Sequence, residues 1–244
     1  MSKEYPGVLT RHKVLHQTFH KVGESAFDKE PLPIYSDMIE GFAEVLKRNI
    51  KAKRQNVVVV TGATGSGKSV FAIKLAMAID PDFSFKNDYI YSAKDLVTKL
   101  KKDRTQVSPV SLFDEGSIIL NSKNFARSED KLIENLFNTM RSRGWTTIIC
   151  IPDFNALNKS VRTTHVNFRV SCGRAPLPGY QGRGFAKLFK YSKVSEFTDV
   201  YWKPLCWGIY TDLRKKVKEV YEARKAESQD KFIDVLTTTI GDEE

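Results

Sequence analysis

Residues Asn56–Ser69 read NVVVVTGATGSGKS, and this stretch decides the fold. Its four consecutive valines predict a strand that is buried on both faces, as strands of parallel sheets are. After Thr61, the eight residues GATGSGKS match the pattern GxxxxGK(S/T) without a gap. Glycines let the backbone bend so that successive N–H groups point at one anion, and a helix that begins near Lys68 adds the positive end of its dipole. The stretch therefore predicts a strand, a phosphate-binding loop (P-loop) and a helix in direct succession.

The P-loop predicts a site for ATP with Mg²⁺. Lys68 is expected to place its charge beside the β- and γ-phosphates, and the hydroxyl of Ser69 to ligate the metal. A glycine-rich turn with an exposed lysine is the alternative, but it leaves the valine run unexplained. ATP is expected rather than GTP because the guanine-reading pattern NKxD is absent: Asn158-Lys159-Ser160 is not followed by the aspartate. The predicted nucleotide-binding residues are Gly62, Ala63, Thr64, Gly65, Ser66, Gly67, Lys68, Ser69 and Val70.

A second acidic element follows another apolar run. Val110–Phe113 reads as a buried strand and ends at Asp114-Glu115. A carboxylate at the tip of a neighbouring strand can hold Mg²⁺ through water, which is the role expected of Asp114. Glu115 is expected to polarise the attacking water as a general base, which favours hydrolysis over phosphoryl transfer to a small acceptor. Without the P-loop, the same pair would read as a solvated turn.

Strands and helices alternate around these motifs. Apolar spacing and capping residues predict helices over 36–49, 68–79, 93–102 and 128–143, and short apolar runs predict strands over 56–61, 89–91, 110–113 and 146–151. This rhythm indicates an α/β P-loop NTPase fold with a RecA-like, mostly parallel central sheet and helices on both faces. A basic β-hairpin or loop is expected near the carboxyl terminus, and then a charged helix from Asp212 to about Ala226.

Length and composition indicate one large domain or one domain with appendages. The chain has 244 residues, of which 41% are hydrophobic, and a formal net charge of +10, which permits a polyanionic partner. We expect an N-terminal extension over 1–34, the ATPase domain over 35–226 and a C-terminal tail over 227–244. In the extension, His12, His16 and His20 are spaced by four, which fits either a metal-binding helix face or a polar tail.

Apolar runs and cysteines bear on location. No run is long enough to span a membrane, and Met1–Arg11 lacks the apolar segment of a secretory signal. The three cysteines are far apart, which argues against a disulfide framework and a zinc site and favours a reducing compartment. A cytoplasmic protein is therefore expected, in the host cytoplasm if the chain is viral.

A basic stretch follows the last core strand. Residues 154–195 contain no Asp or Glu, and they interleave lysines and arginines with aromatic residues. Cations neutralise nucleic-acid phosphates and aromatic rings stack on bases, so the stretch predicts a loop that contacts DNA. The alternative is a solvated basic hairpin whose aromatic residues belong to the core. The predicted DNA-binding residues are Arg174, Arg183, Lys187 and Lys190.

The order of these motifs resembles that of the FtsK/HerA-type DNA-pumping ATPases. The resemblance covers about Asn56 to Arg162 and consists of the P-loop, the Asp114-Glu115 strand end, the helix end Arg141-Ser142-Arg143-Gly144 and the apolar strand after it. It is nearest to the small archaeal and viral members that include genome-packaging ATPases, with a kinship to Zot-like phage assembly proteins. The resemblance implies a homo-oligomeric ring, DNA as a partner, and a viral capsid or assembly protein as a further partner.

The resemblance also assigns a role to Arg141 as the arginine that such rings insert into the neighbouring subunit's nucleotide site. An arginine placed there would stabilise transition-state charge, while the alternative for Arg141 and Arg143 is to complement the helix dipole. One departure is clear: family members usually carry a polar sensor at the tip of the next strand, where this chain has Pro152. Asp153 or Asn155 is then the candidate substitute.

The function these features favour is an Mg-ATP-hydrolysing DNA motor that forms a ring and packages a viral genome or translocates DNA. The first alternative is a helicase-loader-like or partition-like switch, in which ATP gates a protein partner. The second is a Zot-like assembly ATPase, for which a membrane anchor would be expected and none is visible. The third is a nucleotide-binding module without catalysis, against which the intact P-loop and Asp114-Glu115 argue.

Overall fold

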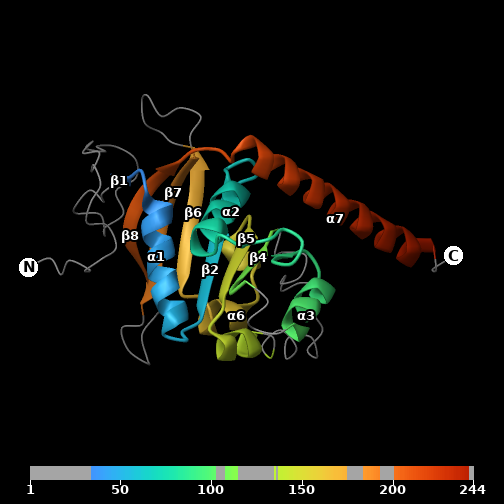
Figure 1. Cartoon of the computed structure of the whole chain (residues 1–244), viewed down its shortest axis with the longest axis horizontal. Helices are drawn as coiled ribbons and strands as arrows, with labels where there is room; N and C mark the ends of the chain where they lie inside the picture. The colour runs from blue at the N-terminus through green and yellow to red at the C-terminus, as the bar shows by residue number, and fades with distance from the viewer. Residues whose placement is uncertain are drawn as a thin grey trace, which may run out of the picture.

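The structure is a computed structural model that describes residues 34–102, 108–114, 135, 137–174, 184–192 and 201–241 (Figure 1). The strands in these residues are β1 (Ile34–Tyr35), β2 (Asn56–Thr61), β3 (Tyr89–Ile90), β4 (Val110–Phe113), β5 (Thr146–Ile151), β6 (Phe168–Arg174), β7 (Gly184–Ser192) and β8 (Tyr201–Tyr210). The helices are α1 (Met38–Lys51), α2 (Lys68–Ile79), α3 (Ala93–Lys101), α6 (Lys159–Thr164) and α7 (Lys215–Gly241), with a 3-10 turn η2 (Phe154–Ala156). Residues 137–143 are also helical.

The strands form one sheet in the order β1-β8-β7-β6-β2-β5-β4-β3. The strands from β6 to β3 run parallel, whereas β7 pairs antiparallel with both β6 and β8. β5 lies between β2 and β4, so the P-loop strand and the Asp114 strand are separated by one strand and end at the same edge. Open parallel sheets bind ligands at this carboxyl edge. The expected α/β fold with a RecA-like, mostly parallel sheet is confirmed.

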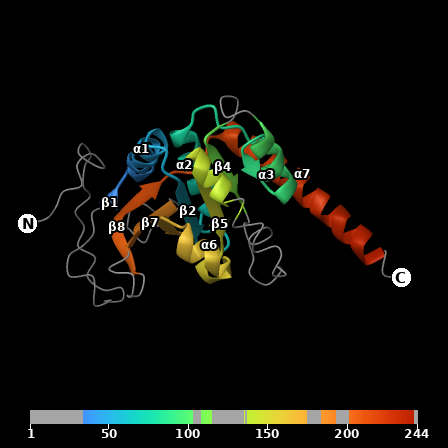
Figure 2. The same ribbon diagram turned by 90° about the horizontal axis from the view of Figure 1, so that it is seen from below.

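Helices cover both faces of the central sheet. Alternate valines of β2 point to opposite sides: Val58 and Val60 join the core under α1 and α2, and Val57 and Val59 join the core under residues 137–143 and α6. All four valines are fully buried, as the run predicts. Figure 2 shows α6 on the side of the sheet opposite α1.

Several predicted boundaries hold and one is wrong. α2, β2, β4 and β5 begin and end where the sequence predicts. The last helix does not end near Ala226 but continues to Gly241, so residues 227–241 of the predicted tail are helical. The helix predicted over 128–143 is described only in its second half, and residues 1–33 of the predicted N-terminal extension, with its three histidines, lie outside the described residues. No helix in the described part of the chain is long and apolar enough to cross a membrane.

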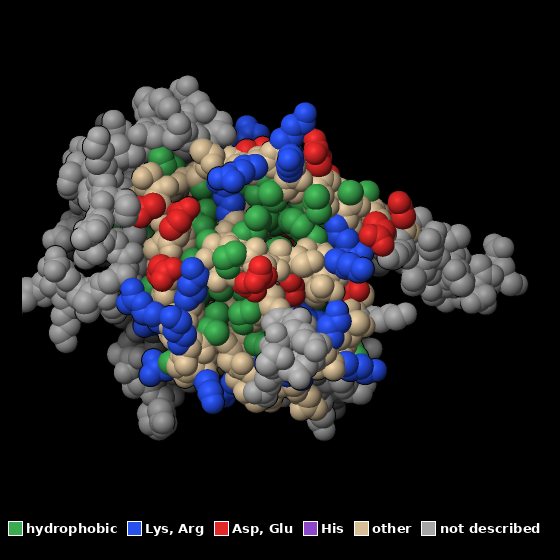
Figure 3. All heavy atoms as spheres, in the orientation of Figure 1, with side chains coloured by type: hydrophobic (Ala, Val, Ile, Leu, Met, Phe, Trp, Pro, Cys, Tyr) green, Lys and Arg blue, Asp and Glu red, His purple; other side chains and the backbone are tan. Residues whose placement is uncertain are grey.

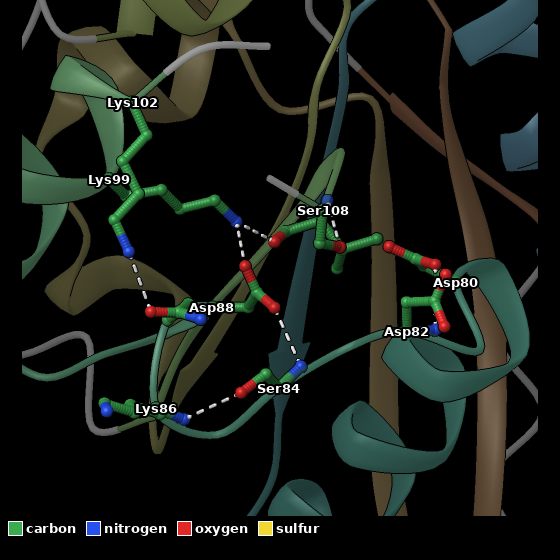
Figure 4. A network of polar contacts seen from close by, with 10 residues as sticks. Asp80, Asp82, Ser84, Lys86, Asp88, Lys99, Lys102 and Ser108 are labelled. Atoms are coloured by element: carbon green, nitrogen blue, oxygen red, sulfur yellow. Dashed lines mark hydrogen bonds and ion pairs between the residues drawn. The ribbon is translucent and has the colours of Figure 1, made fainter. Parts of the chain in front are cut away.

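A buried ion pair fixes α3 against the start of β3 (Figure 4). The ammonium of Lys99 lies 2.9 Å from Asp88 Oδ1, and both side chains are almost fully buried. Lys99 also donates to the carbonyl of Val110, and the other oxygen of Asp88 accepts the backbone N–H of Ser84 at 2.7 Å. Burial lowers the pKa of Lys99, while the neighbouring Asp88 charge opposes that shift. Removing one partner would leave the other charged and desolvated.

We therefore expect Lys99→Met to lower the free energy of unfolding by about 3–5 kcal/mol, since it leaves Asp88 buried without its cation. The double variant Lys99→Met/Asp88→Asn should lose less, because the amide that replaces the carboxylate has no charge and keeps an oxygen for Ser84. Urea unfolding curves of the three proteins measure this. Lys47→Met, in the exposed Lys47–Glu44 pair, is the control and should leave the midpoint unchanged. A double variant as unstable as Lys99→Met would contradict this account.

Candidate active site

The P-loop joins β2 to α2 through three glycines with left-handed backbone. Gly62, Gly65 and Gly67 have φ angles of +146°, +76° and +86°. Gly62 also needs to lack a side chain, because a Cβ there would lie 2.4 Å from the carbonyl oxygen of Cys172 on β6. The glycines that the phosphate-binding pattern requires are thus the residues at which this loop turns.

The amino terminus of α2 is arranged to receive an anion. The helix begins at Lys68 after Gly67, no side chain caps its first turn, and that turn carries no acidic residue. The first N–H groups of a helix have no partner within the helix, and they attract negative charge. The Ser66 hydroxyl is buried within the loop with no hydrogen-bond partner. Uncapped amides and an unpartnered hydroxyl in one loop fit a phosphate group.

The ammonium group of Lys68 lies across the P-loop. Lys68 Nζ donates to the carbonyl of Ala63 at 2.9 Å, which holds the ammonium over the loop that would enclose a phosphate chain. On the far side, Tyr210 at the end of β8 donates through its hydroxyl to the carbonyl of Gly67 at 3.1 Å. The Cys150 thiol lies 4.0 Å from the carbonyl of Lys68, and burial raises its pKa well above the ordinary value. The loop is therefore supported by β5, β6 and β8.

The two residues predicted to handle the metal are in direct contact. Ser69 Oγ donates to Asp114 Oδ1 at 2.8 Å, although the two residues are 45 positions apart. Mg²⁺ prefers hard oxygen ligands, commonly one or two protein oxygens together with phosphate and water. A hydroxyl and a carboxylate beside an uncapped helix terminus fit that requirement, so Ser69 would bind the ion and Asp114 would orient its water shell. Mg²⁺ would there neutralise phosphate charge.

Two tyrosines that the sequence analysis did not identify complete this corner. Asp114 Oδ2 accepts hydrogen bonds from Tyr221 at 2.8 Å and from Tyr89 at 3.3 Å. Burial raises the pKa of both phenols, and the negative charge of Asp114 raises it further, so both stay protonated and donate. Tyr89 begins β3, which pairs with β4, whereas Tyr221 belongs to α7. The alternation of strands and helices in the sequence indicates that Tyr89 lies near Asp114. No local sequence pattern indicates that Tyr221 lies there too.

The remaining predicted catalytic residues are placed differently. Glu115 directly follows Asp114 but lies outside the described residues. Arg141 is exposed, and it precedes β5 at the amino edge of the sheet, where Thr146 pairs with Asn56. The P-loop follows β2 at the opposite edge, about 20 Å of strand away. Arg141 therefore cannot reach the P-loop of its own chain.

Arg143 has a structural role. Its guanidinium lies 5.0 Å from the ring centroid of Trp145 and donates to the carbonyl of Leu100 at 2.7 Å. Gly144 follows with a φ of +68°, which ends the helix as expected. Arg141 and Arg143 are thus distinct: one side chain packs inside the domain and the other is presented to its surroundings.

The two candidate substitutes for the polar sensor follow β5, and each accepts a local hydrogen bond. The carbonyl of Pro152 accepts the backbone N–H of Gly62 at 3.3 Å. Asp153 accepts the backbone N–H of Asn155 at 3.0 Å, and Asn155 accepts a hydrogen bond from Arg162 at 2.6 Å. The two candidate substitutes for the sensor are therefore engaged in the local turn.

The four predicted DNA-binding residues do not form one patch. Arg174 ends β6 at the P-loop edge, where it pairs with Gly184, whereas Lys190 pairs with Phe168 at the opposite edge. Lys187 lies on the face of β7 opposite Lys190, and its ammonium is 4.4 Å from the ring centroid of Trp207. Arg183 lies outside the described residues. On the face drawn in Figure 3, basic side chains are dispersed and acidic side chains lie among them.

No protein-family model matches the chain, and no curated protein matches it either. Solved structures similar to it include a KaiC-like protein from the hyperthermophilic archaeon Pyrococcus horikoshii, with 12% identity and a TM-score of 0.38 over 64% of this chain and 89% of the other. They also include the flagellar accessory protein FlaH from Methanocaldococcus jannaschii, with 15% identity and a TM-score of 0.35 over 70% of this chain and 96% of the other. The assignment of a RecA-like P-loop fold rests on the strand order and the loop geometry described above.

Two glycine variants test the loop geometry. Gly62→Ala and Gly65→Ala both place a side chain at positive φ, which costs about 1–2 kcal/mol. Only the first also meets backbone, since nothing lies within 4 Å of a Cβ at Gly65. We expect Gly62→Ala to lower the melting temperature by more than Gly65→Ala does. Equal shifts in differential scanning calorimetry would show that the approach of β6 does not constrain the loop.

Proposed function

We propose that this chain is an Mg-ATP hydrolase that works as a ring-forming DNA motor, of the kind that packages a viral genome or translocates DNA. The single observation that carries the hydrolase part is the contact between Ser69 and Asp114 at 2.8 Å, beside the uncapped first turn of α2. It brings the metal-binding hydroxyl, the acidic strand end and the phosphate loop together at the carboxyl edge of the sheet.

The chemistry follows from the roles of these groups. The amides of the P-loop and α2 would bind the β- and γ-phosphates, and Lys68 would exchange the Ala63 carbonyl for phosphate oxygens. Water attacks the γ-phosphorus, the bond between that phosphorus and the bridging oxygen of ADP breaks, and ADP and phosphate leave. Glu115, the residue after Asp114, would take the proton of the attacking water.

The position of Arg141 supports a ring. Its side chain is exposed at the edge of the sheet that faces away from its own P-loop. In a head-to-tail ring, the amino edge of one subunit can approach the carboxyl edge of the next, so Arg141 would complete the neighbouring site. Such a site is complete only in the assembly.

Contact with DNA is proposed from the acid-free stretch. Arg174 lies at the P-loop edge, where it pairs with Gly184. A cation at this edge would link hydrolysis to movement of a polyanion through phosphate contacts. Lys190 lies at the other edge and would contribute to a different surface.

One observation favours a second candidate, a switch that acts on a protein partner. The long helix α7 contacts the metal-site carboxylate through Tyr221, and in both views its carboxyl end points away from the sheet (Figures 1 and 2). A helix held at the nucleotide site can report its occupancy to a partner without any movement along DNA.

The hydrolase proposal predicts a defined pattern of activity. Wild type should bind ATP with Mg²⁺ and release phosphate, and duplex DNA should raise the rate. Lys68→Ala should lose nucleotide binding, and Glu115→Gln should keep binding but lose about 10²–10⁴-fold in kcat. Lys101→Ala, which removes an exposed lysine of α3 outside the acid-free stretch, is the matched control and should behave as wild type. Calorimetry and phosphate release measure both steps. A rate that DNA does not change, in a protein that stays monomeric with ATP, would exclude the motor and leave the switch.

Mixing variants tests Arg141 directly. Lys68→Ala and Arg141→Ala should each be inactive, because one lacks a bound nucleotide and the other lacks the neighbour's arginine. When the two are mixed, an intact P-loop meets an intact Arg141 at some interfaces, and phosphate release should exceed the sum of the separate rates. If mixing restores nothing while both proteins still assemble with wild type, Arg141 does not act between subunits.

A further inference from the structure

The carboxylate of Asp114 is held from three sides. Its Oδ1 accepts from Ser69, and its Oδ2 accepts from Tyr89 and Tyr221. Asp114 is only 4% exposed, so its two oxygens depend on these hydroxyls for solvation. The oxygen beside the P-loop and the oxygen beside the tyrosines therefore have separate partners, and the carboxylate has a defined orientation.

We propose that Tyr221 is a positioning residue for Asp114, and that through this bond the docking of α7 is linked to the binding of Mg²⁺ with nucleotide. The inference rests on the proposed function and deepens it. When Oδ1 turns from Ser69 to the water shell of the ion, the phenols keep Oδ2 in place. Hydrogen bonds from the second shell orient metal-binding groups in this way, and their loss usually costs 10–100-fold in metal affinity or activity.

The ring of Tyr221 and its hydroxyl have separable roles. The ring packs among aromatic residues, with its centroid 6.3 Å from those of Phe85 and Tyr89. The hydroxyl projects beyond this cluster to Asp114 at 2.8 Å. Phenylalanine at this position keeps the apolar contacts and removes the hydroxyl with its hydrogen bonds to Asp114 and Ser69, so its effect reports on these hydrogen bonds rather than on packing.

The contact also bears on α7 as a whole. Tyr221 and Val217, with Leu213 before the helix, pack against the core under α1 and α2, while Val220 is 54% exposed. The salt bridges of Lys218 and Arg224 are local, to Asp212 and Glu227. A few apolar contacts and the bond to Asp114 thus attach the start of α7 to the sheet. A change in the Asp114 carboxylate therefore acts on the attachment of the helix.

The experiment compares Tyr221→Phe with wild type and with a matched control. Tyr191→Phe is that control, because Tyr191 donates a similar bond to the Thr163 carbonyl at the far end of β7. Binding of a fluorescent ATP analogue is titrated with Mg²⁺, and hydrogen exchange of residues 215–230 is followed with nucleotide in EDTA and with nucleotide plus Mg²⁺. Melting temperatures establish that all three proteins are folded.

We expect Tyr221→Phe to raise the half-saturating Mg²⁺ concentration about 10-fold, with nucleotide affinity in EDTA unchanged. In wild type and Tyr191→Phe, Mg²⁺ should slow exchange in residues 215–230 severalfold, and in Tyr221→Phe this Mg²⁺-dependent slowing should disappear. An unchanged Mg²⁺ titration, or slowing equal to that of wild type, would overturn the inference while leaving the hydrolase intact. A wild-type protein that binds no nucleotide would instead overturn the proposed function.

Discussion

A single buried carboxylate, that of Asp114, joins parts of the chain that are far apart in sequence. It accepts hydrogen bonds from the first turn of α2, from the start of β3 and from α7. A desolvated carboxylate is unfavourable unless donors surround it, so the three elements cannot move apart without exposing or orphaning that charge. The parallel sheet brings the carboxyl ends of its strands to one edge, and Asp114 holds α2, β3 and α7 together at that edge.

The central elements could be predicted because their causes are local. The four valines of β2 favour burial on both faces of the sheet. The glycines of the P-loop lie where the chain can continue only with a positive φ angle. The contact of Ser69 with Asp114 follows from motif order together with the rule that parallel strands end at one edge. These features depend on residue type and spacing, which a single sequence contains.

Other features escape prediction because their partners are distant. Tyr221 meets Asp114 across 107 positions, and nothing near either residue in the sequence indicates the pairing. Composition predicts the basic residues as one group, yet strand alternation and register place Lys187 and Lys190 on opposite faces of β7 and place Lys190 at the edge opposite Arg174. The predicted end of the last helix near Ala226 is wrong, because α7 continues to Gly241 with no glycine or proline before that residue to stop it.

The order of strands has a consequence for how the chain is made. β2 lies at the centre of the sheet, and both its neighbours, β5 and β6, come from residues 146–174. During synthesis, the valine-rich segment leaves the ribosome long before either partner exists. Such a segment is prone to pair with other chains until its partner strands have been synthesised. Long-range strand pairing also slows folding. The residue run that makes the sheet stable is therefore also the one most exposed to misassembly until the second half of the chain has been translated.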